Sequence, residues 1–258
     1  MWFDTHAHLY YLKERTVEVA VHEALKNQVK AMVVPGVDRE SNLQALACVK
    51  KYDFLWAGLG FHPNDCFDLT EDDWTTLAKQ IRSRKVVALG ETGLDYYRSQ
   101  NNAMMALQHE AFDRHIQLAK SFKLPLIVHT RSAKNDTLVW LEKCYHDNVG
   151  GILHCFSEDM EMAKKAIDYG FYISFSGIIT FKNASELREV VKHCPKDRVL
   201  IETDCPYLSP APFRGKENQP AWTYLVGEMV ASLWDMSVAD TQQQLWQNSH
   251  KVFQLPLA

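Results

Sequence analysis

The regular alternation of short apolar segments with segments of helical periodicity constrains the fold most strongly. Eight apolar runs recur along the chain, at residues 2–9, 31–34, 54–60, 86–91, 124–129, 151–154, 172–175 and 199–202. Between them, apolar residues recur every three or four positions, as over residues 39–50 and 102–122. Strands that alternate with helices form parallel sheets. In a chain of 258 residues, eight such strands are expected to close into a barrel, an α/β fold of the (β/α)8 TIM-barrel type. An open, doubly wound sheet is the alternative.

Length and composition indicate one barrel domain that spans residues 1–258. Hydrophobic residues make up 47% and charged residues 23%, which is ordinary for a soluble globular protein. Residues 205–220 are the one Pro-rich, irregular segment. We expect this segment to be an active-site loop after the eighth strand rather than a linker, because only a helix-rich tail follows it.

Charge and hydropathy narrow the class of protein further. No run approaches the roughly 18 to 20 apolar residues that cross a bilayer, and the N-terminus lacks a signal-peptide pattern, so we expect a cytoplasmic protein. The six cysteines contain no C-x-x-C pair and are expected to be reduced. With a net charge of −4, binding of a phosphate-bearing substrate requires local positive charge or metal ions. No obligate protein partner is evident, and a monomer is the default expectation.

Two histidines near the N-terminus predict half of a metal site. Asp4, His6 and His8 alternate within the first apolar run, and alternate residues of a strand point to the same face. Neutral imidazole is a common ligand for zinc, iron, nickel and copper. A single histidine is more often a hydrogen-bonded core residue, whereas a pair with an in-phase acid favours a pair of ligands.

The other predicted strands end in further candidate ligands. In a parallel barrel, functional groups gather at the C-terminal ends of the strands. The sequence places there His6, His8, His62, Glu91, His129, His154, Glu202 and Asp204. The remaining histidines fall in helical or tail segments, where packing or surface roles are expected; they are His22, His109, His115, His146, His193 and His250.

This set of side chains predicts two divalent ions rather than one. Four imidazoles and two carboxylates exceed the three protein ligands of a single catalytic zinc. They suit two ions about 3.5 to 4 Å apart, which we expect to be Zn²⁺, Mn²⁺, Mg²⁺ or Fe²⁺. Glu91 is the expected bridge and Asp204 the expected ligand or proton acceptor, so these two are the candidate catalytic residues. Glu202 is expected to support the site from one level deeper. The predicted ligands are His6, His8, Glu91, His129, His154 and Asp204.

Seven motifs then point to one family. In chain order they are FDTHAHL (3–9), GFHP (60–63), GETGLDYY (90–97), VHTR (128–131), HCFS (154–157), ETDCPYL (202–208) and RGKENQP (214–220). They run along nearly the whole chain and resemble the motif series of the TatD family, metal-dependent DNases and related hydrolases of the amidohydrolase superfamily. The resemblance implies a TIM barrel with a two-metal site made by the six predicted ligands, with His62 lining the pocket. It further implies 3′-5′ exonuclease activity or other phosphoester hydrolysis on nucleic acid.

Three residues depart from that family pattern. Thr92 stands where Ile is usual, Glu158 where Gly is frequent, and Glu217 where a basic residue is common. None of these departures removes a predicted metal ligand. The two extra acids can alter a phosphate-facing rim, so the metal chemistry is better supported than a polymeric nucleic-acid substrate.

Cations and aromatic residues near the predicted strand ends are candidates for substrate binding. Arg131, Arg214 and Lys216 can hold phosphate oxygens, with His62 beside them and Arg98 as a further candidate. Five aromatic residues can stack on bases, namely Tyr96, Tyr97, Phe156, Phe181 and Tyr207. Cys155 alternates away from His154 in the predicted strand, so we expect it to pack behind that strand.

Three classes of function are compatible with these residues. The first is a phosphodiesterase or deoxyribonuclease. The second keeps the metal centre but cleaves an ester or amide, such as the aminoacyl ester of a charged tRNA or a small cyclic amide. The third, a metal-binding interaction protein, is disfavoured because the open site and its candidate base are complete. Phosphoryl transfer calls for cationic clamps, whereas attack on a carbonyl needs an oxyanion partner such as His62 and fewer cations.

Overall fold

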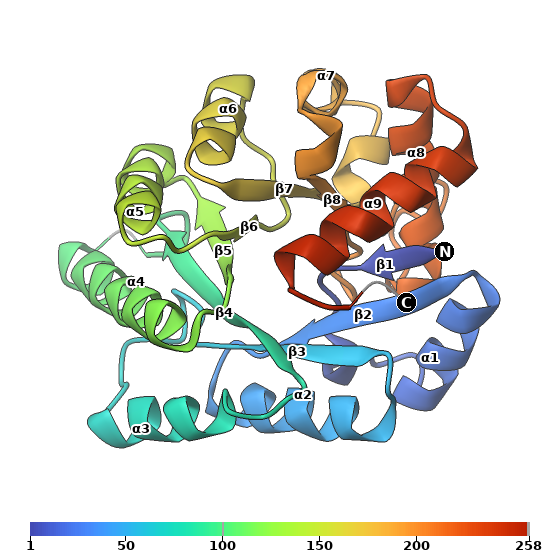
Figure 1. The fold of residues 1–258 in the computed structure, drawn as a ribbon. Helices are drawn as coiled ribbons and strands as arrows, with labels where there is room; N and C mark the ends of the chain where they lie inside the picture. The colour runs from blue at the N-terminus through green and yellow to red at the C-terminus, as the bar shows by residue number, and fades with distance from the viewer. Residues whose placement is uncertain (100, 257–258) are drawn as a thin grey trace.

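The computed structural model describes residues 1–99 and 101–256, and its strands form one parallel sheet in chain order (Figure 1). The strands are β1 (Trp2–Asp4), β2 (Val29–Pro35), β3 (Leu55–Leu59), β4 (Val86–Asp95), β5 (Leu126–Arg131), β6 (Gly151–Leu153), β7 (Phe171–Phe175) and β8 (Val199–Ile201). A parallel bridge between Ala7 and Cys205 joins the two ends of the sheet. The sheet therefore closes nearly completely, and the predicted (β/α)8 barrel is confirmed.

Helices alternate with these strands and surround the sheet (Figure 1). They are α1 (Val17–Lys26), α2 (Arg39–Lys51), α3 (Glu71–Gln80), α4 (Asn102–Phe122), α5 (Lys134–His146), α6 (Met160–Asp168), α7 (Ser185–His193), α8 (Thr223–Trp234) and α9 (Val238–Val252). Short 3-10 helices lie in the connections of the described residues: η1 (Leu9–Tyr11), η2 (Gly177–Thr180), η3 (Lys196–Arg198) and η4 (Pro220–Trp222). In the described part of the chain, no helix has the length and apolar character needed to cross a membrane.

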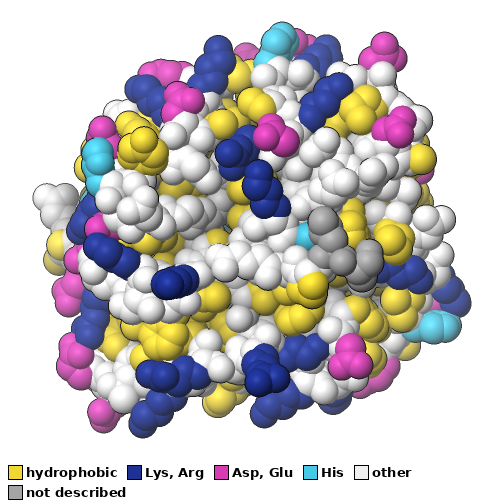
Figure 2. Space-filling model, in the orientation of Figure 1, with side chains coloured by type: hydrophobic (Ala, Val, Ile, Leu, Met, Phe, Trp, Pro, Cys, Tyr) yellow, Lys and Arg dark blue, Asp and Glu magenta, His cyan; other side chains and the backbone are white. Residues whose placement is uncertain are grey.

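Local sequence explains where several helices begin. The side chains of Thr16, Asp38 and Asp159 precede α1, α2 and α6, and each accepts a hydrogen bond from a backbone N–H of the first turn. Acidic residues in the first turn and basic residues in the last turn are favourable for the helix dipole, as in α2 with Glu40 and Lys51. Figure 2 shows that, on the face drawn, Lys and Arg side chains occur in separate groups rather than as one continuous basic surface.

The core has two layers that follow from strand alternation. In β2, Ala31 and Val33 belong to the smaller cluster, which α9 closes with Val252. Met32 and Val34 belong to the larger cluster, which includes residues of the surrounding helices. Because successive side chains of a strand point to opposite faces, one set fills the barrel and the other supports the helices.

Gly227 of α8 allows that helix to lie directly against β1. A Cβ atom at this position would lie 2.2 Å from Cζ3 of Trp2. The indole of Trp2 is buried. The absence of a side chain at Gly227 thus sets how closely α8 packs on the barrel.

The first strand is shorter than its apolar run predicts. β1 ends at Asp4, so His6 and His8 follow the strand instead of lying on one of its faces, and the prediction is wrong at this point. The backbone N–H groups of Thr5 and Ala7 donate to carbonyl groups of β8 and β2, respectively. The segment after β1 thus runs between β8 and β2. Bonds to each strand in turn hold it extended, although it forms no regular strand pairing.

Other strand boundaries shift in both directions. β4 continues to Asp95, which places Glu91 inside the strand, and β5 continues to Arg131. β6 and β8 end one residue before His154 and Glu202. The segment between β8 and η4 contains no further helix or strand among the described residues, as expected for a long loop.

Candidate metal centre

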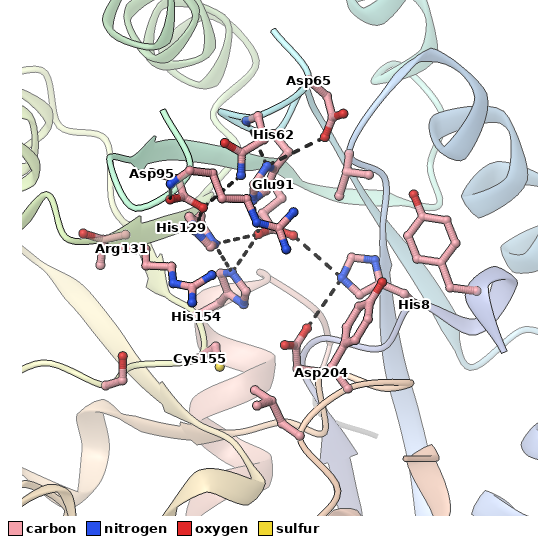
Figure 3. Close-up of a pocket in the computed structure, with 18 of the residues that line it drawn as sticks. His8, His62, Asp65, Glu91, Asp95, His129, Arg131, His154, Cys155 and Asp204 are labelled. Atoms are coloured by element: carbon pink, nitrogen blue, oxygen red, sulfur yellow. Dashed lines mark hydrogen bonds and ion pairs between the residues drawn. The ribbon is translucent and has the colours of Figure 1, made fainter. Parts of the chain in front are cut away.

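Glu91 of β4 lies between two pairs of histidines, His6 with His8 and His129 with His154. Figure 3 shows it between His8 on one side and His129 and His154 on the other. Its Oε1 lies 2.9 Å from Nε2 of His154 and 3.0 Å from Nδ1 of His129. Its Oε2 lies 3.4 Å from Nε2 of His6 and 3.7 Å from Nε2 of His8. Each oxygen of one carboxylate therefore faces a different pair of imidazoles.

Asp204 completes the side that contains His6 and His8. Its Oδ1 lies 3.7 Å from Nε2 of His6 and 3.5 Å from Nε2 of His8. The two Nε2 atoms are 3.1 Å apart, a distance at which they must share a proton or hold a cation. His6, His8 and Asp204 form one group with converging ligand atoms, and Glu91, His129 and His154 form another.

This donor set fits divalent cations. The ligand atoms within each group lie within 4.8 Å of one another. Imidazole nitrogens and carboxylate oxygens suit zinc, manganese and iron. Nδ1 of His6 is buried without a hydrogen-bond partner among the described residues, so no hydrogen bond at Nδ1 restricts how the ring turns its Nε2 toward a cation.

Two further carboxylates lie behind the histidines of the second group. Oε1 of Glu202 is 3.3 Å from Nδ1 of His154, and it also accepts a hydrogen bond of 2.8 Å from the backbone N–H of Cys155. Oδ2 of Asp95 is 3.4 Å from Nε2 of His129. Each carboxylate favours a proton on the ring nitrogen that faces it, which leaves the other nitrogen free to act as a ligand.

Tyr10 orients His8 in the same way. The Tyr10 hydroxyl donates a 2.6 Å hydrogen bond to the carbonyl of Pro35. It therefore accepts the bond from Nδ1 of His8, at 3.1 Å. The proton of His8 then lies on Nδ1, and Nε2 presents its lone pair to Glu91 and Asp204.

The surrounding histidines lower the pKa of both central carboxylates, which favours their ionised forms. Burial alone would raise the pKa of Glu91, but His154, His62 and His129 hold that pKa well below its ordinary value. Burial also opposes ionisation of Asp204, and its contacts with His8 and His6 outweigh this effect and lower its pKa. Both carboxylates can therefore offer negatively charged oxygens to a cation.

Asp4 positions Asp204 from below. The Asp4 carboxylate is buried and accepts hydrogen bonds from the Thr203 backbone N–H at 2.9 Å and from the Thr203 hydroxyl at 2.6 Å. The amide of Asn218 donates to the carbonyl of Thr203 at 2.9 Å. These bonds fix the backbone beside Asp204, whose φ of 55° lies in the left-handed region that Asp tolerates. Asp4 is thus used to hold the loop and does not face the ligand groups.

A cavity of about 700 Å³ opens above the histidines. Of the predicted ligands, all but the fully buried His6 line it. Other residues that line it include Tyr11, His62, Asn64, Asp65, Asp95, Arg98, Thr130, Arg131, Cys155, Ser157 and Tyr207. The guanidinium of Arg131 lies 3.9 Å from the centre of the Tyr97 ring. Arg131 and His62 both lie at the cavity wall (Figure 3).

The other two predicted substrate-binding cations lie elsewhere. Neither Arg214 nor Lys216 lines the cavity. The guanidinium of Arg214 lies 3.5 Å from the centre of the Phe181 ring, and the ammonium of Lys216 lies 5.5 Å from that of Phe213. Stacking on these aromatic rings holds both cations outside the cavity.

Two other expectations are corrected by the conformation of the loops. Cys155 lines the cavity instead of packing behind its strand, because it follows the end of β6 and has a φ of 46°. The carboxylate of Glu217 accepts hydrogen bonds from the backbone N–H groups of Lys13 and Glu14. Glu217 therefore ties two loops together and does not form part of the cavity wall.

Asp95, Asn64 and Asp65 line the cavity but are not among the site residues predicted from the sequence. Asp95 is four residues after Glu91 in the same strand, an even spacing that places both on one face. That spacing is the signal that could have identified it. Asn64 and Asp65 directly follow the GFHP motif, but nothing in their spacing indicates that they face the cavity.

Comparisons with known proteins agree with this architecture. The family described as TatD related DNase matches residues 3–254. A Bacillus subtilis (strain 168) protein named uncharacterized metal-dependent hydrolase YabD is 41% identical, over 99% of this chain and 100% of its own length. Another, the Escherichia coli (strain K12) protein named uncharacterized metal-dependent hydrolase YcfH, is 40% identical over 98% of this chain and 95% of its own. The crystal structure of the TatD homologue YJJV from E. coli K12 superposes with a TM-score of 0.91 at 28% identity, covering 99% of this chain and 98% of that one. The chain therefore belongs to the TatD family.

Proposed function

We propose that this protein is a divalent-metal-dependent hydrolase that cleaves phosphodiester bonds, as a deoxyribonuclease of the 3′-5′ exonuclease type. The observation that carries the proposal is the position of Glu91, whose two oxygens face two separate pairs of imidazoles at the base of a cavity. This is the arrangement expected of a carboxylate that bridges two cations. The family description, TatD related DNase, supports the choice of bond.

The residues of the centre have separate roles in this proposal. His6, His8 and Asp204 would hold one divalent ion, and His129 and His154 the other, with Glu91 shared. Bound divalent cations supply Lewis acidity, which lowers the pKa of water and offsets negative charge on phosphoryl oxygens. The ionised carboxylate of Asp204 lines the cavity and can accept the proton that an attacking water loses.

Side chains at the cavity wall can position a phosphodiester. Arg131 is exposed and rests on Tyr97, and Arg98 lines the same cavity. A guanidinium binds two phosphate oxygens at once, so this pair can hold a backbone phosphate above Glu91. Tyr207 is exposed at the rim and offers a ring on which a base can stack.

One observation favours a second candidate, hydrolysis of an ester or amide such as an aminoacyl-tRNA ester. In the described part of the chain, Arg98 and Arg131 are the only arginines that line the cavity, and no lysine lines it. Asp65 and Asp95 add negative charge to the same wall. A carbonyl substrate requires fewer cationic clamps than a polyanion.

A substrate panel tests the proposal. The purified protein is incubated with Mg²⁺, Mn²⁺ or Zn²⁺ and with single-stranded DNA, a generic phosphodiester, an aminoacyl ester and a cyclic amide. We expect hydrolysis of the first two, and loss of nearly all of it in Glu91→Gln, which keeps the size of the side chain but removes the charge. Hydrolysis of only the last two would reject the nuclease proposal, and equal activity in Glu91→Gln would reject the site.

A further inference from the structure

His62 differs from the other histidines of the centre in how its ring is held. It lies after β3, lines the cavity, and its Nδ1 accepts a 3.0 Å hydrogen bond from the backbone N–H of Asn64. A ring nitrogen that accepts a hydrogen bond carries no proton, so the proton of the neutral ring must lie on Nε2. The nearest carboxylate to Nδ1 is that of Asp65, at 3.8 Å, which is too far for a competing hydrogen bond.

The Nε2–H of His62 points to the metal centre. Nε2 lies 3.3 Å from Oε1 of Glu91, and the ring meets that of His129 edge to face at 4.5 Å. A protonated ring nitrogen has no lone pair for a cation. His62 therefore presents a hydrogen-bond donor to the centre, whereas the predicted ligands His129 and His154 would present nitrogen lone pairs to a cation.

His62 also belongs to another group of candidate ligands, together with Asp95 and His129. The Asp95 oxygens already accept hydrogen bonds from the side chain of Asn64 at 2.9 Å and from the backbone N–H groups of Tyr97 and Arg98 at 3.0 and 3.1 Å. A further ion here would also require His62 to reverse its tautomer against the Asn64 N–H. Asp95 is better explained as the group that orients His129.

The backbone around His62 is fixed on both sides. The N–H of His62 donates to the carbonyl of Val37 at 2.8 Å, and the N–H of Asp65 donates to the carbonyl of His62 at 2.8 Å. The Asn64 side chain is tied to Asp95. The ring therefore does not have to reorganise when a substrate enters, which is the requirement for an efficient oxyanion-type donor.

We propose that His62 is a catalytic hydrogen-bond donor and not a metal ligand: its neutral Nε2–H binds the non-bridging oxygen on which negative charge grows during hydrolysis. The inference rests on the proposed function, since it names the partner of the substrate oxygen in that reaction. The backbone N–H of Asn64 sets the tautomer of His62, and the loop that carries the ring sets the direction of its Nε2–H.

Paired substitutions separate a donor from a ligand. His62→Gln retains an N–H near the position of Nε2, His62→Met fills the space without a donor, and His129→Met serves as the control for loss of a ligand. Metal content per chain and the kcat and KM values are measured for each, on whichever substrate of the panel the unmodified protein hydrolyses. We expect His62→Met to keep the metal content and KM while kcat falls about 10²- to 10³-fold, with partial recovery in His62→Gln. His129→Met should lose metal.

Loss of metal in His62→Met, or an unchanged kcat, would overturn the inference. A second measurement does not depend on activity. In the full-length, Zn²⁺-loaded protein labelled with ¹⁵N-histidine, long-range ¹H–¹⁵N spectra report the tautomer of His62, assigned by its absence in His62→Gln. We expect a neutral ring protonated at Nε2; a ring protonated at Nδ1, or an Nε2 shift typical of metal coordination, would overturn the assignment. If no substrate is hydrolysed, the proposed function fails, while metal content and the tautomer still decide the role of His62.

Discussion

His115 of α4 joins that helix to β4 and to the loop after β3, and its protonation should lower stability in acid. It is completely buried. Its Nε2 accepts a 3.0 Å hydrogen bond from the N–H of Phe61, and its Nδ1 lies 2.7 Å from the carbonyl of Ala111 and 3.0 Å from the hydroxyl of Thr92. Nδ1 therefore carries the proton. A second proton on Nε2 would face the Phe61 N–H, so the folded protein keeps this ring neutral.

The expected magnitude follows from linkage. Burial lowers the pKa of His115 from 6.5 to about 4, with the charge of Arg114 acting in the same direction and the bond to Ala111 opposing it. Below about pH 6.5 the His115 ring binds a proton in the unfolded chain but not in the folded protein. The contribution of neutral His115 to the free energy of unfolding is therefore present above that pH and is lost as the pH falls toward 4. For these two pKa values the loss is about 2 kcal/mol at pH 5 and about 0.2 kcal/mol at pH 7.

The assay compares the free energy of unfolding in urea at pH 7 and pH 5, with a chelator present so that metal release does not contribute. We expect the unmodified protein to lose about 2 kcal/mol more between these pH values than His115→Gln does. His22→Gln is the matched control, because His22 lies exposed on α1. If His115→Gln and the unmodified protein show the same dependence within about 0.5 kcal/mol, the reasoning from burial and tautomer is wrong.

Three further predictions concern the centre and the packing of the barrel. His6→Ala and His129→Ala should each lose about one of about two divalent ions per chain, measured by elemental analysis of untagged protein; an unchanged count in both variants would contradict the two ligand groups. Arg131→Ala should raise KM for a phosphodiester several-fold, whereas Arg214→Ala should not, because Arg131 lines the cavity and Arg214 rests on Phe181 outside it; the reverse ranking would restore the role that the sequence suggests for Arg214. Gly227→Ala should destabilise the fold by about 1 to 3 kcal/mol in urea unfolding, because its Cβ would lie 2.2 Å from Trp2; no loss would show that α8 can move away from β1.

The predicted metal ligands were accessible from the sequence for a topological reason. Parallel strands of a barrel all end at the same pole, so polar residues at the ends of apolar runs are brought together whatever the loop details. His6, His129, His154 and Glu91 converge in the structure although the boundaries of their strands differ from the apolar runs by one to five residues. The ligand set is thus insensitive to errors in strand ends.

Residues in the loops were much harder to place. Their neighbours in the sequence predict that Arg214 and Lys216 hold phosphate oxygens and that Cys155 packs behind its strand, but the two cations lie outside the cavity wall and Cys155 lies on it. Their positions depend on hydrogen bonds between segments far apart in the sequence, such as those from the backbone N–H groups of Lys13 and Glu14 to Glu217 and from the N–H of Cys155 to Glu202. No pattern in a single segment contains these partners.

The alternation of strands and helices can be read from the sequence, and with it the barrel and the end at which the histidines and acids meet, because hydrophobic periodicity is local and parallel pairing is topological. Which nitrogen of each histidine faces the centre depends on the folded structure. Tyr10 sets that choice for His8, Glu202 for His154 and the N–H of Asn64 for His62. The tautomer of a ring depends on the partner of its second nitrogen, and that partner comes from a backbone or side chain whose position is known only when the chain has folded.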